Sequence, residues 1–128
     1  MVEVRPKNNI LIVDDTPANL RLLSQMLAGQ GYHARPLPDG SLALAAVRAD
    51  PPDLILLDIM MPDIKGYEVC KKIKENPETQ NTKIIVLSAY LDEEKFKKMK
   101  EHGADACFSK PFPLPQLKEE VARLLGLR

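Results

Sequence analysis

The sequence has little that would direct the protein to a membrane or a nucleic acid. No apolar stretch approaches the roughly 20 residues that a membrane-spanning helix needs. The first nine residues are polar and lack the apolar core of a signal peptide. Lys plus Arg and Asp plus Glu both number 18, so the net charge is zero. We therefore expect a cytoplasmic protein that binds neither nucleic acid nor membrane directly.

Cysteine and histidine are scarce, with two residues of each. Cys70 and Cys107 form no C-x-x-C pair, and His33 and His102 are not at metal-ligand spacing. We interpret both cysteines as reduced thiols. His102 directly precedes Gly103, which is typical of the end of a helix. The sequence also contains no zinc motif, Gly-rich phosphate loop or Ser-His-Asp order.

Strand and helix signals alternate along the chain, whose 128 residues suit one domain. Short apolar runs predict strands at 10–13, 33–37, 54–57, 84–87 and 106–109. Apolar residues at helical spacing predict helices over 17–29, 40–47, 66–75, 92–102 and 115–125. This alternation predicts an α/β fold, a doubly wound sheet of five parallel strands flanked by five helices. The continuously apolar strands indicate that helices cover both faces.

Polar residues stand at the carboxyl ends of four of these strands. Asp14 and Asp15 follow the first strand, Asp58 the third, Ser88 the fourth and Lys110 the fifth. Ligand sites in such sheets lie outside the carboxyl ends of the strands, where the strand order reverses. We therefore expect three carboxylates, a hydroxyl and an ammonium to meet in one pocket.

The expected cluster has the chemistry of a phosphoryl-transfer site. Two carboxylates about 4 Å apart repel by roughly 4 kcal/mol at an effective dielectric of about 20, so three of them need a counter-charge. Mg²⁺ suits a few carboxylates together with waters and a phosphoryl group. Asp58 is then the candidate nucleophile, Lys110 the cation beside the incoming group, and Ser88 a donor to a phosphoryl oxygen. The simpler alternatives are helix capping by Asp14 and Asp15, a strand-end hydroxyl at Ser88 and a surface lysine at position 110.

The chain resembles the receiver domains of bacterial two-component response regulators over essentially its whole length. The matching segments are Ile-Leu-Ile-Val-Asp-Asp at 10–15, Pro-Asp-Leu-Ile-Leu-Leu-Asp-Ile-Met-Met-Pro at 52–62, Gly66, Val-Leu-Ser-Ala at 86–89, Gly-Ala-Asp at 103–105 and Lys-Pro-Phe at 110–112. The resemblance implies a flavodoxin-like sheet with strand order 2-1-3-4-5. It also implies a single receiver domain over residues 1–128, with a core of about 8–126 and no output domain.

The resemblance further implies a phospho-acceptor switch rather than an enzyme with turnover. Asp58 would take phosphate from a phosphohistidine on a sensor histidine kinase or a histidine phosphotransfer protein, and would lose it by autodephosphorylation. Asp15, Asp58 and the backbone carbonyl of Met60 would bind Mg²⁺, with Asp14 acting directly or through water. Ser88 would move to bind the phosphoryl group together with Lys110. A downstream protein would bind the face formed by residues 92–125.

Cys107 departs from the family pattern. Similar domains usually carry Tyr or Phe three residues before the lysine, and that ring swings inward when the hydroxyl residue moves. Phe108 is expected on the opposite face of the strand, because successive side chains alternate. We therefore expect phosphorylation without the aromatic switch, with output through the Ser88 loop and the helix that begins near Asp92.

Met60 and Tyr90 are further candidates because each lies two residues beyond a residue of the cluster. In similar domains the side chains at these positions flank the route of the attacking water. Large groups that activate water poorly predict slow autodephosphorylation. The alternative is that both side chains are ordinary surface residues.

Two other functions remain open on the sequence. A pseudo-receiver, which is an interaction module that does not take phosphate, is favoured only by the missing aromatic residue. A phosphoaspartate phosphatase of the dehalogenase type requires a second Asp two residues after the nucleophile, where this chain has Met60. The sequence also leaves open whether the chain is a free-standing regulator or the receiver of a hybrid kinase.

Overall fold

The computed structural model describes residues 8–58, 66–89 and 93–126. Within these ranges five parallel strands form one sheet in the order β2-β1-β3-β4-β5, which confirms the expected fold. The strands are β1 (Asn9–Val13), β2 (His33–Leu37), β3 (Leu54–Asp58), β4 (Lys83–Ser88) and β5 (Ala106–Ser109). The helices are α1 (Pro17–Gly29), α2 (Ala43–Ala49), α3 (Gly66–Glu75), α4 (Glu93–Glu101) and α5 (Leu114–Leu124), with a 3₁₀ turn, η1 (Gly40–Leu42), before α2.

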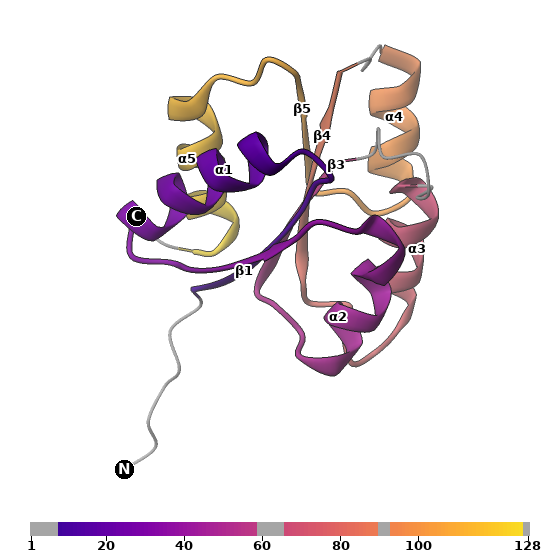
Figure 1. Ribbon diagram of the computed structural model, residues 1–128. Coiled ribbons are helices and arrows are strands. Elements are labelled where there is room, and N and C mark those ends of the chain that lie inside the picture. Colours follow the sequence, from indigo (N-terminus) through magenta and orange to yellow (C-terminus); the bar gives the residue numbers. More distant parts are fainter. Residues whose placement is uncertain (1–7, 59–65, 90–92, 127–128) are drawn as a thin grey trace.

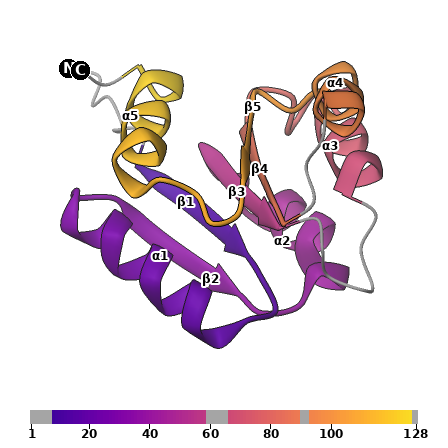
Figure 2. The ribbon, with the colours of Figure 1, turned by 90° about the horizontal axis from the view of Figure 1, so that it is seen from above.

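Helices cover both faces of the sheet, as the apolar strands predict. Figures 1 and 2 show α1 and α5 on one face and α2, α3 and α4 on the other. Successive residues of β1 serve the two faces in turn, so Ile10 and Ile12 pack with α1 and α5, while Leu11 and Val13 pack with α2 and α3. Every residue of β1 and β3 is buried. The two cores hold these central strands in place and so fix where their carboxyl ends lie.

Local sequence signals account for most element boundaries. Pro17 is the first residue of α1, where its missing N–H costs nothing. Gly31 follows α1 at φ +89°, a conformation that favours glycine. Pro36 lies in β2, which pairs only with β1 among the described strands and so is an edge where proline is tolerated.

Two helix starts differ from the expectation. The helix predicted from position 40 begins as the 3₁₀ turn η1, and the Asp39 carboxylate at its N-cap accepts a hydrogen bond from the backbone N–H of Ser41. α5 begins at Leu114 rather than Pro115, and Pro115 is its second residue. Both differences are confined to the first turn of a helix and leave the position of the strands unchanged.

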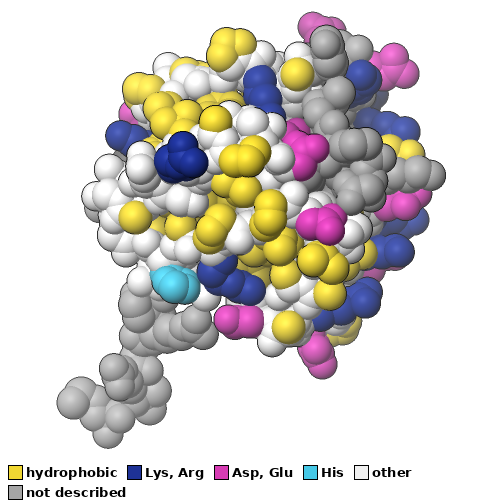
Figure 3. Space-filling model, in the orientation of Figure 1, with side chains coloured by type: hydrophobic (Ala, Val, Ile, Leu, Met, Phe, Trp, Pro, Cys, Tyr) yellow, Lys and Arg dark blue, Asp and Glu magenta, His cyan; other side chains and the backbone are white. Residues whose placement is uncertain are grey.

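Acidic and basic side chains are mixed on the face shown in Figure 3, in keeping with the zero net charge. Leu22, Leu42 and Phe96 are the large apolar side chains that are exposed within the described ranges. They belong to α1, η1 and α4. In the described part of the chain, no helix has the length and apolar character needed to cross a membrane.

Candidate functional site

The register of the sheet brings the carboxyl ends of its strands to one edge. Val13 pairs with Leu57, so the residue after β1 lies beside the end of β3. Asp58 pairs with Leu87, the residue before Ser88, in the next strand. Ser88 in turn pairs with Ser109, which directly precedes Lys110. The predicted site residues therefore come from neighbouring strand ends and share one edge of the sheet.

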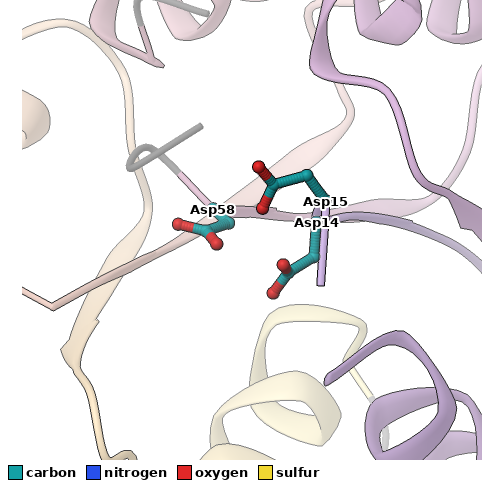
Figure 4. Close-up of side chains that lie close together, drawn as sticks. All are labelled: Asp14, Asp15 and Asp58. Carbon is teal, nitrogen blue, oxygen red and sulfur yellow. The ribbon is translucent and has the colours of Figure 1, made fainter. Parts of the chain in front are cut away.

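Three carboxylates gather at this edge (Figure 4). Asp14 and Asp15 follow β1 and Asp58 ends β3, and one oxygen from each lies within 4.8 Å of the others. Asp14 is 1% exposed and Asp58 is 3% exposed, whereas Asp15 is exposed. The three carboxylates therefore meet as the sequence predicts, and two of them are buried while the third is exposed.

Lys110 supplies the positive charge of the cluster. Its Nζ lies 2.7 Å from Asp58 Oδ2 and 3.5 Å from Asp14 Oδ2. Its backbone N–H donates to the carbonyl oxygen of Ser88 at 2.7 Å, which ties the end of β4 to the residue after β5. The peptide bond between Lys110 and Pro111 is cis. Ser88 is 1% exposed and is the last residue of β4.

The Asp14 carboxylate is held through both of its oxygens. Oδ1 accepts the backbone N–H of Thr16 at 2.9 Å, and Oδ2 accepts Nδ2–H of Asn19 at 3.2 Å. Thr16 occupies the N-cap position of α1, but its own side chain makes no capping hydrogen bond. The capping alternative for Asp14 is therefore realised in part, because the same carboxylate bonds the start of α1 and belongs to the cluster.

Burial raises the pKa of Asp14 above its ordinary value, and the nearby charge of Asp58 raises it further. The hydrogen bond from Thr16, the ammonium of Lys110 and the amide of Asn19 oppose this shift. Asn19 is a site residue that was not predicted from the sequence. The available signal was a carboxamide in the first turn of the helix that directly follows the Asp pair.

The donor set fits a divalent cation. With its three carboxylates ionised, the cluster carries two more negative charges than the single ammonium of Lys110 balances. Two of the three carboxylates are buried. A hard dication with oxygen ligands neutralises that excess, and Mg²⁺ is commonly bound by carboxylates together with waters and phosphoryl oxygens. The exposed Asp15 leaves one side of the cluster open to solvent. Among the described residues, Asp14, Asp15 and Asp58 form the one group of three or more Asp, Glu, His or Cys side chains placed closely enough to hold a metal ion.

Cys107 and Phe108 lie on opposite faces of β5. Cys107 packs against the core beneath α2, α3 and α4, and Phe108 against the core beneath α1 and α5. Cys107 is half-buried, and burial raises the pKa of its thiol. Cys70 belongs to the same core, where burial raises its pKa to about 12. Both thiols are therefore protonated near neutral pH, and both are free cysteines.

Some predicted residues cannot be placed. Met60, Tyr90 and Asp92 lie outside the described residues. The α4 helix is described from Glu93, and His102 directly follows its last residue. The His102 ring nitrogen Nδ1 lies 2.8 Å from the Lys98 carbonyl oxygen, so this histidine lies at a helix end as expected.

Comparisons with known proteins agree with the geometry. Residues 10–122 match the family described as Response regulator receiver domain. The response regulator DivK of Brucella anthropi is 31% identical over 121 residues, which cover 94% of this chain and 98% of DivK. The crystal structure of a CheY-like response regulator receiver domain protein from Methanospirillum hungatei has a TM-score of 0.85 at 30% identity, covering 93% of this chain and 94% of that one.

A Vibrio cholerae protein named "Probable cyclic di-GMP phosphodiesterase" is 42% identical over 112 residues, which cover 88% of this chain. The chain spans only 25% of the length of that relative. The match with the family extends from the second residue of β1 into α5 and spans Asp14, Asp15, Asp58, Ser88 and Lys110. This chain belongs to the response regulator receiver domain family, whose members are generally phospho-acceptor switches of two-component signalling.

Proposed function

We propose that the chain is a Mg²⁺-dependent switch that accepts a phosphoryl group on Asp58. The donor is a phosphohistidine of a sensor histidine kinase or of a histidine phosphotransfer protein. The observation that carries the proposal is the Asp58 carboxylate, which is 3% exposed, lies 2.7 Å from an ammonium and has two more carboxylates within 4.8 Å. A structural ion pair alone would not account for the second and third carboxylates.

Each side chain has a distinct part in the transfer. A carboxylate oxygen of Asp58 forms the new P–O bond while the P–N bond to the donor histidine breaks, and the imidazole leaves with the electron pair. Asp14, Asp15, Asp58 and the backbone carbonyl of Met60 would hold Mg²⁺. Bound there, Mg²⁺ would supply positive charge that offsets the negative charge of the phosphoryl oxygens. Lys110 pairs with the charge that arrives, and the Ser88 hydroxyl donates to a phosphoryl oxygen.

Output passes through the β4 and β5 ends in this proposal. The N–H of Lys110 bonds the Ser88 carbonyl at 2.7 Å, so a displacement of the Ser88 backbone carries the residue after β5 with it. Cys107 is too small to act as the aromatic switch, and a downstream protein binds the face formed by residues 92–125. Cys107→Phe tests this route. Partner affinity and its dependence on phosphorylation should stay the same in the variant, and a large change in either would contradict the route.

Lifetime is proposed to depend on Met60 and Tyr90, whose side chains would flank the path of the water that hydrolyses the acyl phosphate. Polar replacements such as Met60→Asn and Tyr90→Asn should shorten the lifetime of phosphorylated Asp58. The measurement is the decay of the phosphorylated form after removal of the donor. An unchanged decay rate would refute the gating role.

We further propose that residues 8–126 form the receiver core of a cytoplasmic protein without direct contacts to nucleic acid or membrane. Self-phosphorylation and autodephosphorylation are its only expected chemistry. The activity named for the Vibrio cholerae relative is not carried over, because this chain matches a quarter of that protein.

The deciding experiment is intact-mass spectrometry after incubation with acetyl phosphate and Mg²⁺. A single phosphoryl adduct is expected in the wild type and none in Asp58→Asn or in an EDTA-treated sample. Asp53→Asn is a matched control, because Asp53 lies just before the other end of β3 and should leave the adduct intact. A folded protein that binds Mg²⁺ but gains no adduct would instead be a pseudo-receiver, the alternative that the missing aromatic at Cys107 favours.

A further inference from the structure

We propose that Asn19 is a positioning residue, which fixes the Asp14 carboxylate for Mg²⁺ and keeps Lys110 directed at Asp58. The inference rests on the proposed function of the same site. Asn19 is the third residue of α1 and is half-buried at the start of the helix. Unlike the other site residues, Asn19 does not lie at the end of a strand. Its side chain reaches the cluster because α1 begins directly beside the carboxyl end of β1.

The first turn of α1 determines how the Asp14 carboxylate is oriented. One oxygen, Oδ1, is held by the Thr16 N–H at 2.9 Å, and the other, Oδ2, by Nδ2–H of Asn19 at 3.2 Å. A donor on each oxygen fixes the rotation of the carboxylate as well as its position. Because Asp14 is 1% exposed, water has little access to replace a lost donor.

Asn19 also governs where the ammonium of Lys110 lies. Lys110 Nζ is 3.5 Å from Asp14 Oδ2, the same oxygen that Asn19 bonds, and 2.7 Å from Asp58 Oδ2. Without the amide donor, Asp14 Oδ2 would depend on the ammonium alone. The Lys110 side chain would then be drawn toward Asp14 and away from Asp58, the residue at which it is needed.

An uncharged donor is the appropriate choice at position 19. A lysine or arginine there would add a positive charge beside Asp14 and remove part of the negative excess that attracts a dication. A leucine has nearly the same shape as asparagine but donates nothing. The carboxamide therefore orients the ligand without competing with the metal, which is the usual part of groups that hydrogen-bond metal ligands.

The test is titration of the metal-free protein with Mg²⁺ by isothermal calorimetry, without any phosphodonor. Asn19→Leu is expected to weaken Mg²⁺ binding by roughly 10- to 100-fold, the usual effect of losing a partner of a metal ligand. Gln25→Leu, an exposed carboxamide on the same helix, is the matched control and should bind Mg²⁺ as the wild type does. Asn19→Gln keeps the donor on a longer arm and should recover part of the affinity.

Phosphorylation by acetyl phosphate supplies a second readout. The rate of Asn19→Leu should be low at limiting Mg²⁺ and should rise as Mg²⁺ approaches saturation, because Asp58 itself is intact. A smaller deficit should persist at saturation, because the Lys110 ammonium is displaced toward Asp14. Far-UV circular dichroism and thermal unfolding establish that each variant is folded. If Asn19→Leu fails to fold, the comparison of Asn19→Gln with the wild type carries the test.

The possible failures are distinguishable. A wild type that binds no Mg²⁺ would overturn the metal-dependent function and this inference together. A wild type that binds Mg²⁺, with folded Asn19→Leu binding it within about twofold, would overturn only the positioning role of Asn19. A phosphorylation rate of Asn19→Leu that does not rise with Mg²⁺ would also contradict it, because the loss would then lie wholly in a step other than metal binding.

Discussion

Replacing Asp14 by asparagine is expected to stabilise the metal-free protein. Asp14 is 1% exposed and shares the cluster with Asp15 and Asp58, so its charge is both desolvated and repelled. Asparagine keeps the shape: its Oδ1 can accept the Thr16 N–H, and its Nδ2–H can donate to the carboxamide oxygen of Asn19 once that amide is rotated. The substitution therefore removes mainly the charge.

The expected gain follows from the distances. At an effective dielectric of about 20, repulsion across 4.8 Å is about 3.5 kcal/mol for each of the other two carboxylates. The attraction to Lys110 at 3.5 Å is about 4.7 kcal/mol on the same scale. Solvent weakens the repulsion between Asp14 and the exposed Asp15. Burial of the Asp14 charge adds a desolvation cost to the free energy of the folded state. We expect Asp14→Asn to gain about 1–3 kcal/mol in free energy of unfolding.

The assay is urea unfolding in EDTA, measured over a range of pH. The pKa of Asp14 is raised in the folded protein, so the native state binds the proton more tightly than the unfolded state. Wild-type stability should therefore fall as the pH rises from the unfolded pKa through the folded one. The advantage of Asp14→Asn is complete above the folded pKa and shrinks as the pH approaches the ordinary value of 3.8.

Two comparisons make the result specific. Asp15→Asn should have a smaller effect in EDTA, because that carboxylate is exposed. Added Mg²⁺ should stabilise the wild type more than Asp14→Asn, because binding to the native state adds RT ln(1 + [Mg²⁺]/Kd). If Asp14→Asn instead lowers the free energy of unfolding by about 1 kcal/mol in EDTA at neutral pH, the reasoning is refuted. The charge of Asp14 would then have to stabilise the folded protein.

Three further predictions follow from single contacts. Lys110→Met leaves two buried carboxylates without their ammonium and should cost on the order of 2–3 kcal/mol in EDTA, measured by urea unfolding, with Mg²⁺ restoring part of the loss. Gly103→Ala should cost about 1–3 kcal/mol in thermal unfolding, because Gly103 has φ +107° and an added Cβ would lie 2.6 Å from Lys74 Cγ; an unchanged melting temperature would contradict this. Native-state alkylation by iodoacetamide should label Cys107 before Cys70, whose buried thiol has a pKa of about 12, and peptide masses showing the reverse order would be inconsistent with the core packing.

The sheet and the location of the site could be predicted because both depend on strong local signals. The apolar runs at 10–13, 54–57 and 84–87 are buried on both faces, so their continuity identifies them as central strands. Strand ends are then marked by the polar residues that follow. The convergence of Asp14, Asp58 and Lys110 required only that the strands be parallel.

Contacts that depend on how one element is rotated against another could not be predicted. The bond from Asn19 to Asp14 exists only because the first turn of α1 faces the cluster, and no apolar periodicity fixes that rotation to within a hydrogen-bond length. The Lys74–Asp105 ion pair, at 3.1 Å between α3 and the loop before β5, is of the same kind. The 3₁₀ start at Asp39 was missed for a different reason, since a short polar cap favours either helix type.

In the proposed switch, Lys110 would let the site act on the rest of the sheet without an aromatic residue at position 107. One residue contacts three strand ends: its ammonium reaches the carboxylates that follow β1 and end β3, and its N–H bonds the last residue of β4. A change of charge at Asp58 alters the position that the ammonium prefers, because the nearest attraction of that ammonium acts at 2.7 Å. Since side chain and backbone belong to the same residue, we expect a shift of Nζ to be transmitted to the Ser88 carbonyl and hence to the β4 end. In this proposal the signal passes through the contacts of Lys110, so an aromatic side chain at position 107 is not required.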